Sequence, residues 1–141
     1  MNCVCVDAGL VGKFVTSEEN SALVEQLVSR WQVDEIEMVA PAFASAEVDS
    51  VLRQKVIRGE LTQAIADAAF RVVCQMPIAL DAETDCRERA WEIAKMLALP
   101  TVYDAVYLAL AEQRGCEFWT ADNRLYERVK DTFGFVKLLA G

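Results

Sequence analysis

The chain has 141 residues, carries a formal net charge of −8 and is 54% hydrophobic. The length suits one domain, residues 1–141, with a substantial buried core, and the hydrophobic content excludes an intrinsically disordered chain. The acidic balance argues against a protein that coats nucleic acid through bulk positive charge, although a nuclease stays open, and the absence of histidine excludes catalysis and zinc binding through imidazole.

Short apolar runs alternate along the chain with stretches of helical periodicity. In the first half we predict a strand over 3–6, a helix over 17–31 capped by Ser17, a strand over 36–39, a helix from Pro41 to about Arg58, and a helix over 61–74. In the second half we predict a weak strand over 78–80, helices over 83–98 and 102–114, a strand over 117–120, a helix over 122–132 and a strand over 135–138. This order predicts an α/β fold, with a short-stranded parallel sheet between two helical layers.

Bulky aromatic side chains recur within these apolar stretches. We expect them in the core rather than on a base-stacking surface, and they are Trp31, Trp91, Tyr103, Tyr107 and Trp119. No apolar run is long enough to span a bilayer, and the N-terminus lacks the charged start of a signal peptide, so we expect a cytoplasmic protein without a membrane segment. The five cysteines show no Cys-x-x-Cys spacing, which makes a disulfide framework or zinc knuckle improbable.

Two aspartates follow predicted strands. Asp7 ends the run over 3–6, and Asp122 follows the run over 117–120. In an open parallel sheet, ligands bind outside the carboxyl ends of the strands, where the strand order switches. Each aspartate could equally cap the helix that follows it, and both interpretations stay open at this point.

Two further acids lie in predicted helices. Glu47 shares a helix face with Phe43 and Val51, where an unpaired glutamate would be expensive, so a ligand role explains it better than a solvated one. Asp104 fits a capping box that begins at Thr101, and a structural role for it is as well supported as a ligand role. Several carboxylates gathered in one place repel one another unless a hard divalent cation joins them, so the joint pattern predicts a metal site made of oxygen ligands.

The segments around these acids resemble the PIN domain, and in order and spacing they are most similar to small PIN toxins of the VapC type. The similarity covers essentially the whole chain and is carried by Val6-Asp7-Ala8, Ala46-Glu47-Val48 with Leu52-Arg53, the run from Tyr103-Asp104 to Ala111, and Thr120-Ala121-Asp122 with Arg124-Leu125. The sequence departs from the common pattern in two places, with Ser50 where many members have asparagine and Gly9 where serine is commoner.

The resemblance implies a PIN-like three-layer α/β/α fold and an endoribonuclease that depends on Mg²⁺ or Mn²⁺. It also implies a cognate antitoxin that blocks the cleft, and commonly a homodimer. It carries the acidic, metal-binding site onto Asp7, Glu47, Asp104 and Asp122, and it gives the Thr120 hydroxyl a supporting role in orienting ligands. Asp7 and Asp104 are expected as direct ligands, with Glu47 and Asp122 acting through water or in an outer shell.

Two rival functions remain. Asp7 is placed for a phosphoacceptor of receiver or phosphatase type, but the Asp-x-Asp of the phosphatases and the paired acids of receivers are absent at the first strand. The second rival is an interaction domain in which the acids are only helix caps and surface charge.

Overall fold

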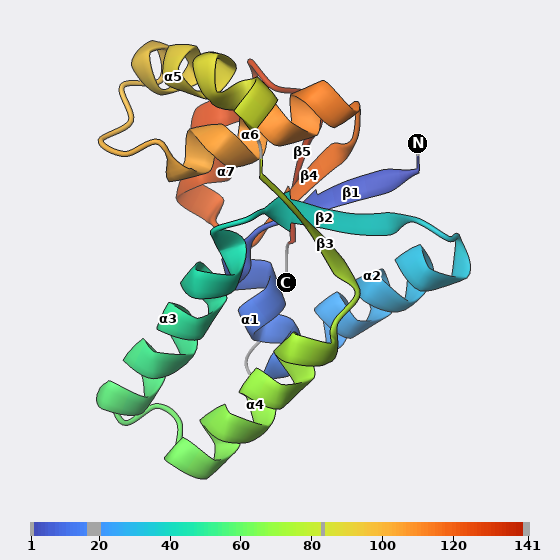
Figure 1. Ribbon diagram of the computed structural model, residues 1–141, viewed down its shortest axis with the longest axis vertical. Coiled ribbons are helices and arrows are strands. Elements are labelled where there is room, and N and C mark those ends of the chain that lie inside the picture. Colours follow the sequence, from blue (N-terminus) through green and yellow to red (C-terminus); the bar gives the residue numbers. More distant parts are fainter. Residues whose placement is uncertain (1, 17–20, 83, 140–141) are drawn as a thin grey trace.

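The computed structural model describes residues 2–16, 21–82 and 84–139, in which short strands alternate with helices (Figure 1). The strands are β1 (Cys3–Val6), β2 (Glu37–Pro41), β3 (Ile78–Asp81), β4 (Glu117–Thr120) and β5 (Val136–Leu138). The α-helices are α1 (Ala8–Val15), α2 (Ser21–Val33), α3 (Ala44–Ile57), α4 (Gln63–Gln75), α5 (Arg87–Met96), α6 (Tyr103–Arg114) and α7 (Asn123–Val129), and a 3₁₀ turn, η1 (Thr84–Cys86), precedes α5.

All strand pairs are parallel, and the sheet order is β3-β2-β1-β4-β5. The chain therefore builds outward from β1 to β3, crosses back, and adds β4 and β5 on the other side of β1. The strand order switches between β1 and β4, whose register pairs Val4 with Glu117 and Val6 with Trp119. A crevice at the carboxyl ends of β1 and β4 is thus the expected ligand position in this topology.

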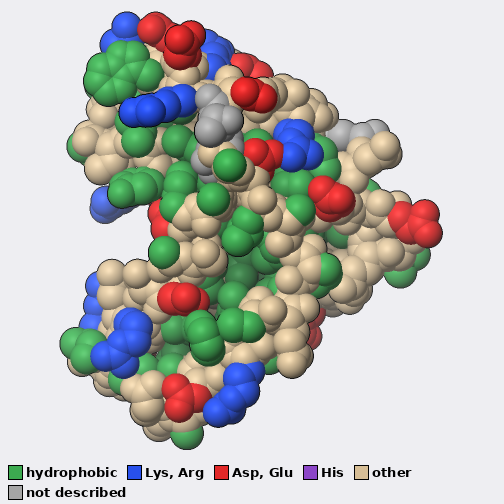
Figure 2. Space-filling view, in the orientation of Figure 1, with side chains coloured by type: hydrophobic (Ala, Val, Ile, Leu, Met, Phe, Trp, Pro, Cys, Tyr) green, Lys and Arg blue, Asp and Glu red, His purple; other side chains and the backbone are tan. Residues whose placement is uncertain are grey.

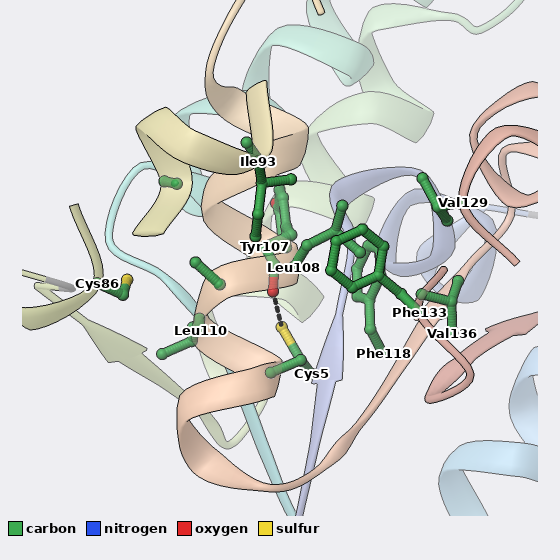
Figure 3. Packing of buried hydrophobic residues seen from close by; sticks show 14 of the residues in the cluster. Cys5, Cys86, Ile93, Tyr107, Leu108, Leu110, Phe118, Val129, Phe133 and Val136 are labelled. Atoms are coloured by element: carbon green, nitrogen blue, oxygen red, sulfur yellow. Dashed lines mark hydrogen bonds between the residues drawn. The ribbon is translucent and has the colours of Figure 1, made fainter. Parts of the chain in front are cut away.

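Helices cover both faces of the sheet, and each face has its own apolar core. Val4 and Val6 face the side covered by α1–α4, whereas Cys5 between them faces α5–α7, as the period of two along a strand requires. On the α5–α7 side, the thiol of Cys5 donates a hydrogen bond to the main-chain oxygen of Tyr107 at 3.9 Å, and the rings of Phe118 and Tyr107 stack (Figure 3). The predicted α/β fold with a parallel sheet between helical layers is confirmed.

Several predicted boundaries are wrong in detail. Pro41 does not open a helix: it ends β2 in register with Asp81 of β3, and α3 begins at Ala44. A fixed φ near −65° suits the first turn of a helix as well as a strand end, so the sequence alone does not choose between them. The predicted helix over 83–98 is a 3₁₀ turn followed by the shorter α5, and the one over 122–132 is the shorter α7.

Other predictions fall partly or wholly outside the described ranges. Ser17, the predicted cap, lies outside the described residues, and α2 is described from Ser21.

Two of the aromatic residues expected in the core are exposed instead: Trp91 is 61% exposed and Tyr103 is 50% exposed. Trp91 lies on α5, which packs mainly on α6 instead of on the sheet, and Tyr103 is the first residue of α6. Within the described ranges, every helix is too short or too polar to cross a membrane.

Candidate active site

The two aspartates at strand ends both cap helices. Asp7 follows β1, and its Oδ1 accepts the main-chain N–H of Leu10 at 2.8 Å at the start of α1. Asp122 follows β4, and its Oδ1 accepts the N–H groups of Arg124 at 2.9 Å and Leu125 at 3.1 Å at the start of α7. The capping interpretation of both residues is therefore correct, and it fixes each carboxylate at the sheet edge instead of removing it from the site.

Thr120 connects these two aspartates. It is the last residue of β4, and its side chain is fully buried at 0% exposure. Its hydroxyl donates a hydrogen bond to Oδ2 of Asp7 and accepts the main-chain N–H of Asp122 at 3.0 Å. A threonine here locks the Asp7 carboxylate in one orientation, because both oxygens of Asp7 are then held by protein donors.

Glu47 is held by a tyrosine from another helix. It lies in the first turn of α3, and its Oε1 accepts the hydroxyl of Tyr107 from α6 at 2.8 Å. Tyr107 is 2% exposed, and burial together with the Glu47 charge raises the pKa of its hydroxyl, so this group stays protonated and donates.

Tyr107 was predicted as a core residue, which it is, but its role toward Glu47 was missed. The available signal was chemical: a tyrosine buried by its ring still needs a partner for its hydroxyl. An acid on a helix that covers the same strand ends was the natural candidate.

Asp104 differs from the other three acids. The predicted capping box at Thr101 is wrong, since the residue that caps α6 is Val102 and it makes no side-chain capping bond. Asp104 instead occupies the first turn of α6, and no residue in the described part of the chain hydrogen-bonds to its carboxylate. Burial raises the pKa of Asp104, and the nearby charge of Asp122 raises it further.

Electrostatic coupling through Asp104 joins the acids into one group. The pKa of Asp7 is raised to about 6, and burial is the largest cause. The hydrogen bonds from Thr120 and Leu10 oppose this rise, and the charge of Asp104 adds to it. Burial also raises the pKa of Glu47, against the hydrogen bond from Tyr107, and Asp104 raises it again. Asp104 therefore acts on Asp7 and Glu47, and Asp122 acts on Asp104.

All the predicted acids line one pocket of about 680 Å³ at the carboxyl ends of β1 and β4. Figure 2 shows the molecule hollowed on the left of the view, between the α5–α7 helices above and α3 below. Thr120 lies behind the wall of this pocket and does not line it. The lining residues are Asp7, Ala8, Gly9, Lys13, Phe43, Ala46, Glu47, Ser50, Val51, Gln54, Tyr103, Asp104, Tyr107, Ala121 and Asp122.

The chemistry of these side chains fits a hard divalent cation. Carboxylate oxygens are the protein ligands that Mg²⁺ and Mn²⁺ prefer. Burial and neighbouring charges raise the pKa values of Asp7, Glu47 and Asp104, and a bound cation would stabilise the charged forms of these acids. Among the described residues, no group of three or more acidic or cysteine side chains lies close enough together to hold a metal ion in this structure. Asp104 is the acid whose carboxylate is not committed to a hydrogen bond there.

Comparison with known proteins identifies the family. The PIN domain profile matches residues 4–131. Ribonuclease VapC3 of Mycobacterium tuberculosis, from strains CDC 1551 / Oshkosh and ATCC 25618 / H37Rv, is 38% identical over 88 residues, and this match spans 62% of each chain. The crystal structure of Mycobacterium tuberculosis VapC20, a sarcin-ricin loop cleaving toxin, superposes with a TM-score of 0.62 over 92% of this chain and 95% of that chain at 14% identity, which establishes similarity of fold. The chain belongs to the PIN domain family.

Proposed function

We propose that this protein is an endoribonuclease that depends on Mg²⁺ or Mn²⁺ and acts in the cytoplasm as the toxin of a toxin–antitoxin pair. The observation that carries the proposal is the meeting of Asp7, Glu47, Asp104 and Asp122 in one pocket at the switch in strand order. Membership of the PIN domain family supports nuclease chemistry, and the partial match to a protein named as a ribonuclease supports RNA as the substrate.

Each acid has a distinct part in this proposal. Asp7 and Asp104 hold the cation directly, and Glu47 and Asp122 complete the site through water or as outer partners. Thr120 fixes the orientation of Asp7 through its hydroxyl, and Tyr107 does the same for Glu47. These two hydroxyl groups are positioning groups, because each acts on substrate only through the acid that it holds.

A divalent cation held by Asp7 and Asp104 would supply Lewis-acid activation of the phosphate and of water for hydrolysis. The side chains then need no covalent chemistry of their own. Asp7 keeps a single orientation while substrate binds, because two donors hold its two oxygens. The products expected from this chemistry carry a 5′-phosphate and a 3′-hydroxyl.

A cognate antitoxin is the proposed protein partner, and the toxin itself is proposed to form a homodimer. The acidic pocket would accept a basic side chain of the antitoxin, since an arginine can pair in bidentate fashion with carboxylates that otherwise hold the cation. Co-purification from the native operon tests this proposal. A small partner protein with a basic side chain for the pocket should accompany the protein, and isolation of the protein alone would contradict the proposal.

The rival functions are less well supported by the geometry. A phosphoacceptor of phosphatase or receiver type has a further acid close to the nucleophilic aspartate at the first strand, but Asp7 is followed by Ala8 and Gly9. A pure interaction domain would explain Asp7 and Asp122 as caps, but it gives no reason for the partly buried carboxylate of Asp104, which has no hydrogen-bond partner among the described residues. Labelling with acetyl phosphate tests the first rival, and a Mn²⁺ titration tests the second.

The experiment that tests the proposal is cleavage of total RNA by the purified protein. Cleavage should require Mg²⁺ or Mn²⁺ and should stop on addition of EDTA. Sequencing of the product ends should give the 5′-phosphate and 3′-hydroxyl pattern. Undiminished cleavage in metal-free buffer would reject the mechanism, and absence of cleavage with either metal would reject the function.

A further inference from the structure

An exposed aromatic ring lies beside the acidic group. Tyr103 is 50% exposed, opens α6, and is followed directly in the chain by Asp104. Large exposed aromatic side chains in the described ranges are also found at Phe70 and Trp91, but those two line other pockets, whereas Tyr103 lines the pocket of the acids. Its position is therefore specific to the proposed active site.

The Tyr103 ring is held in place by a series of aromatic contacts that reaches into the core. Phe43 meets Tyr103 edge to face, with ring centroids 5.1 Å apart and planes at 72°. Phe43 in turn meets Tyr107 at 5.7 Å and 89°, and Tyr107 stacks on Phe118 at 5.4 Å. Since this backing orients the ring before any ligand binds, stacking a further ring on it requires little additional ordering.

The net negative charge of the protein favours a contribution to RNA binding that does not depend on charge. With a net charge of −8, the protein gains little affinity from bulk attraction to phosphates. Among the described residues that line the pocket, Lys13 is the sole lysine or arginine. On the face drawn in Figure 2, lysine and arginine side chains stand scattered among aspartate and glutamate. An interaction that does not depend on charge would therefore add to the binding that the cation and Lys13 provide, and base stacking on an aromatic ring is such an interaction.

We propose that Tyr103, backed by Phe43, stacks an unpaired RNA base that flanks the phosphodiester bound at the acids. The inference rests on the proposed function and deepens it by assigning a residue of this chain that binds the substrate beside the acids. A base inside a duplex is stacked on its neighbours and has no free face, whereas loops and single strands can splay a base onto a tyrosine. Because Tyr103 and Asp104 line the same pocket, the stacked base belongs to a nucleotide next to the cleaved bond.

Binding measurements with matched variants test the proposal. A fluorescent short RNA of randomised sequence serves as the probe in Mg²⁺, and the Asp7→Asn background prevents its cleavage. Tyr103→Leu keeps an apolar side chain but removes the ring, and it should weaken binding by about five- to a hundredfold. Tyr103→Phe keeps the ring and should bind like the parent. Trp91→Leu removes an exposed ring that does not line this pocket and should also leave binding unchanged.

Four further readouts separate stacking from a general loss of structure. Circular dichroism and melting temperature should be the same for Tyr103→Leu and Tyr103→Phe. Photo-crosslinking of RNA that contains iodouridine should place the crosslink on Tyr103. In cleavage assays with protein that retains Asp7, Tyr103→Leu should raise KM more than it lowers kcat. Binding of a duplex of the same composition should be weaker and should not change with Tyr103→Leu.

The outcomes distinguish this inference from the function on which it rests. If the parent cleaves RNA but Tyr103→Leu binds and cleaves like the parent, the stacking role is overturned and the nuclease stands. A crosslink that maps away from Tyr103, or equal binding of duplex and single strand, overturns the stacking role as well. If the parent neither binds nor cleaves RNA, the proposed function fails and the inference fails with it.

Discussion

The four acids of the pocket fall into two pairs that are held in different ways. Asp7 and Asp122 stand at strand ends, and main-chain N–H groups of the following helices fix them. Glu47 and Asp104 stand in the first turns of helices and take no part in capping: Glu47 is held by a tyrosine hydroxyl, and Asp104 has no hydrogen-bond partner in the described ranges.

This difference distinguishes acids that also stabilise the fold from an acid that serves only the proposed cation site. A capping aspartate contributes to the start of its helix whether or not a cation binds. A partly buried acid that caps nothing contributes only repulsion to the metal-free protein. The strand-end pair should therefore show mixed effects on mutation, whereas Asp104 should show an effect on activity without a loss of stability.

The largest expected effect is on cleavage and does not distinguish the pairs. Asp7→Asn and Asp104→Asn should each lower RNA cleavage by at least about a hundredfold, because each removes a carboxylate proposed to hold the cation directly. Circular dichroism spectra should stay native for both variants. Near-normal cleavage by either variant would remove that residue from the catalytic group.

The next effect is a pH-dependent change in stability at Asp7. Its pKa is about 6 in the folded protein against an ordinary value of 3.8, so ionising Asp7 destabilises the folded state. The penalty is absent below about pH 3, where Asp7 is protonated in both states, grows between the two pKa values and is complete above about pH 7. In EDTA at pH 7.5, Asp7→Asn should raise the free energy of unfolding by up to about 3 kcal/mol.

Urea unfolding at several pH values measures this change. The advantage of Asp7→Asn should shrink as the pH falls and vanish near pH 3. Asparagine keeps the cap to Leu10, since its side-chain oxygen can accept the same N–H. A variant that is less stable than the parent at every pH would show that the Thr120 contact outweighs the burial of charge.

Asp122 should show a smaller effect, of opposite sign, that depends on the replacement. Asp122→Ala removes the cap of α7 and should lower the free energy of unfolding by about 1 kcal/mol, whereas Asp122→Asn retains the cap and should be nearly neutral. Urea unfolding in EDTA compares the two. Equal stability of the alanine and asparagine variants would mean that the cap contributes nothing.

Asp104 should show the smallest effect on the metal-free protein. Asp104→Asn should leave its stability unchanged or raise it slightly, because burial and Asp122 disfavour the charged form and no cap is lost. Mg²⁺ should raise the melting temperature of the parent more than that of the variant, since only the parent retains the full set of ligands. Thermal melts in EDTA and in Mg²⁺ test both statements, and a destabilised variant with an unchanged Mg²⁺ response would contradict the role of Asp104.

The sequence predicts the parts of this site that depend on strand ends. A polar residue directly after a buried apolar run must lie at the sheet edge, which locates Asp7 and Asp122 and their capping roles. The start of α6 was harder, because the pattern from Thr101 to Asp104 fits a capping box, while the folded chain begins the helix at Tyr103 without one.

Contacts between distant elements were beyond the sequence pattern. The Tyr107 hydroxyl meets Glu47 across 60 positions of the chain, and apolar spacing reports only that the tyrosine ring is buried. The exposure of Tyr103 was likewise missed, because the first residue of a helix follows the helical pattern without having to pack on the sheet.

The central claim is that Asp104 joins the four acids into one cation site, and direct Mn²⁺ titration tests it most directly. Electron paramagnetic resonance should detect Mn²⁺ bound by the parent and by Asp131→Asn, a control at an exposed acid that does not line the pocket. Asp104→Asn should bind Mn²⁺ at least about tenfold more weakly. Equal affinity of Asp104→Asn and the parent, or no Mn²⁺ binding by the parent at all, would contradict the account.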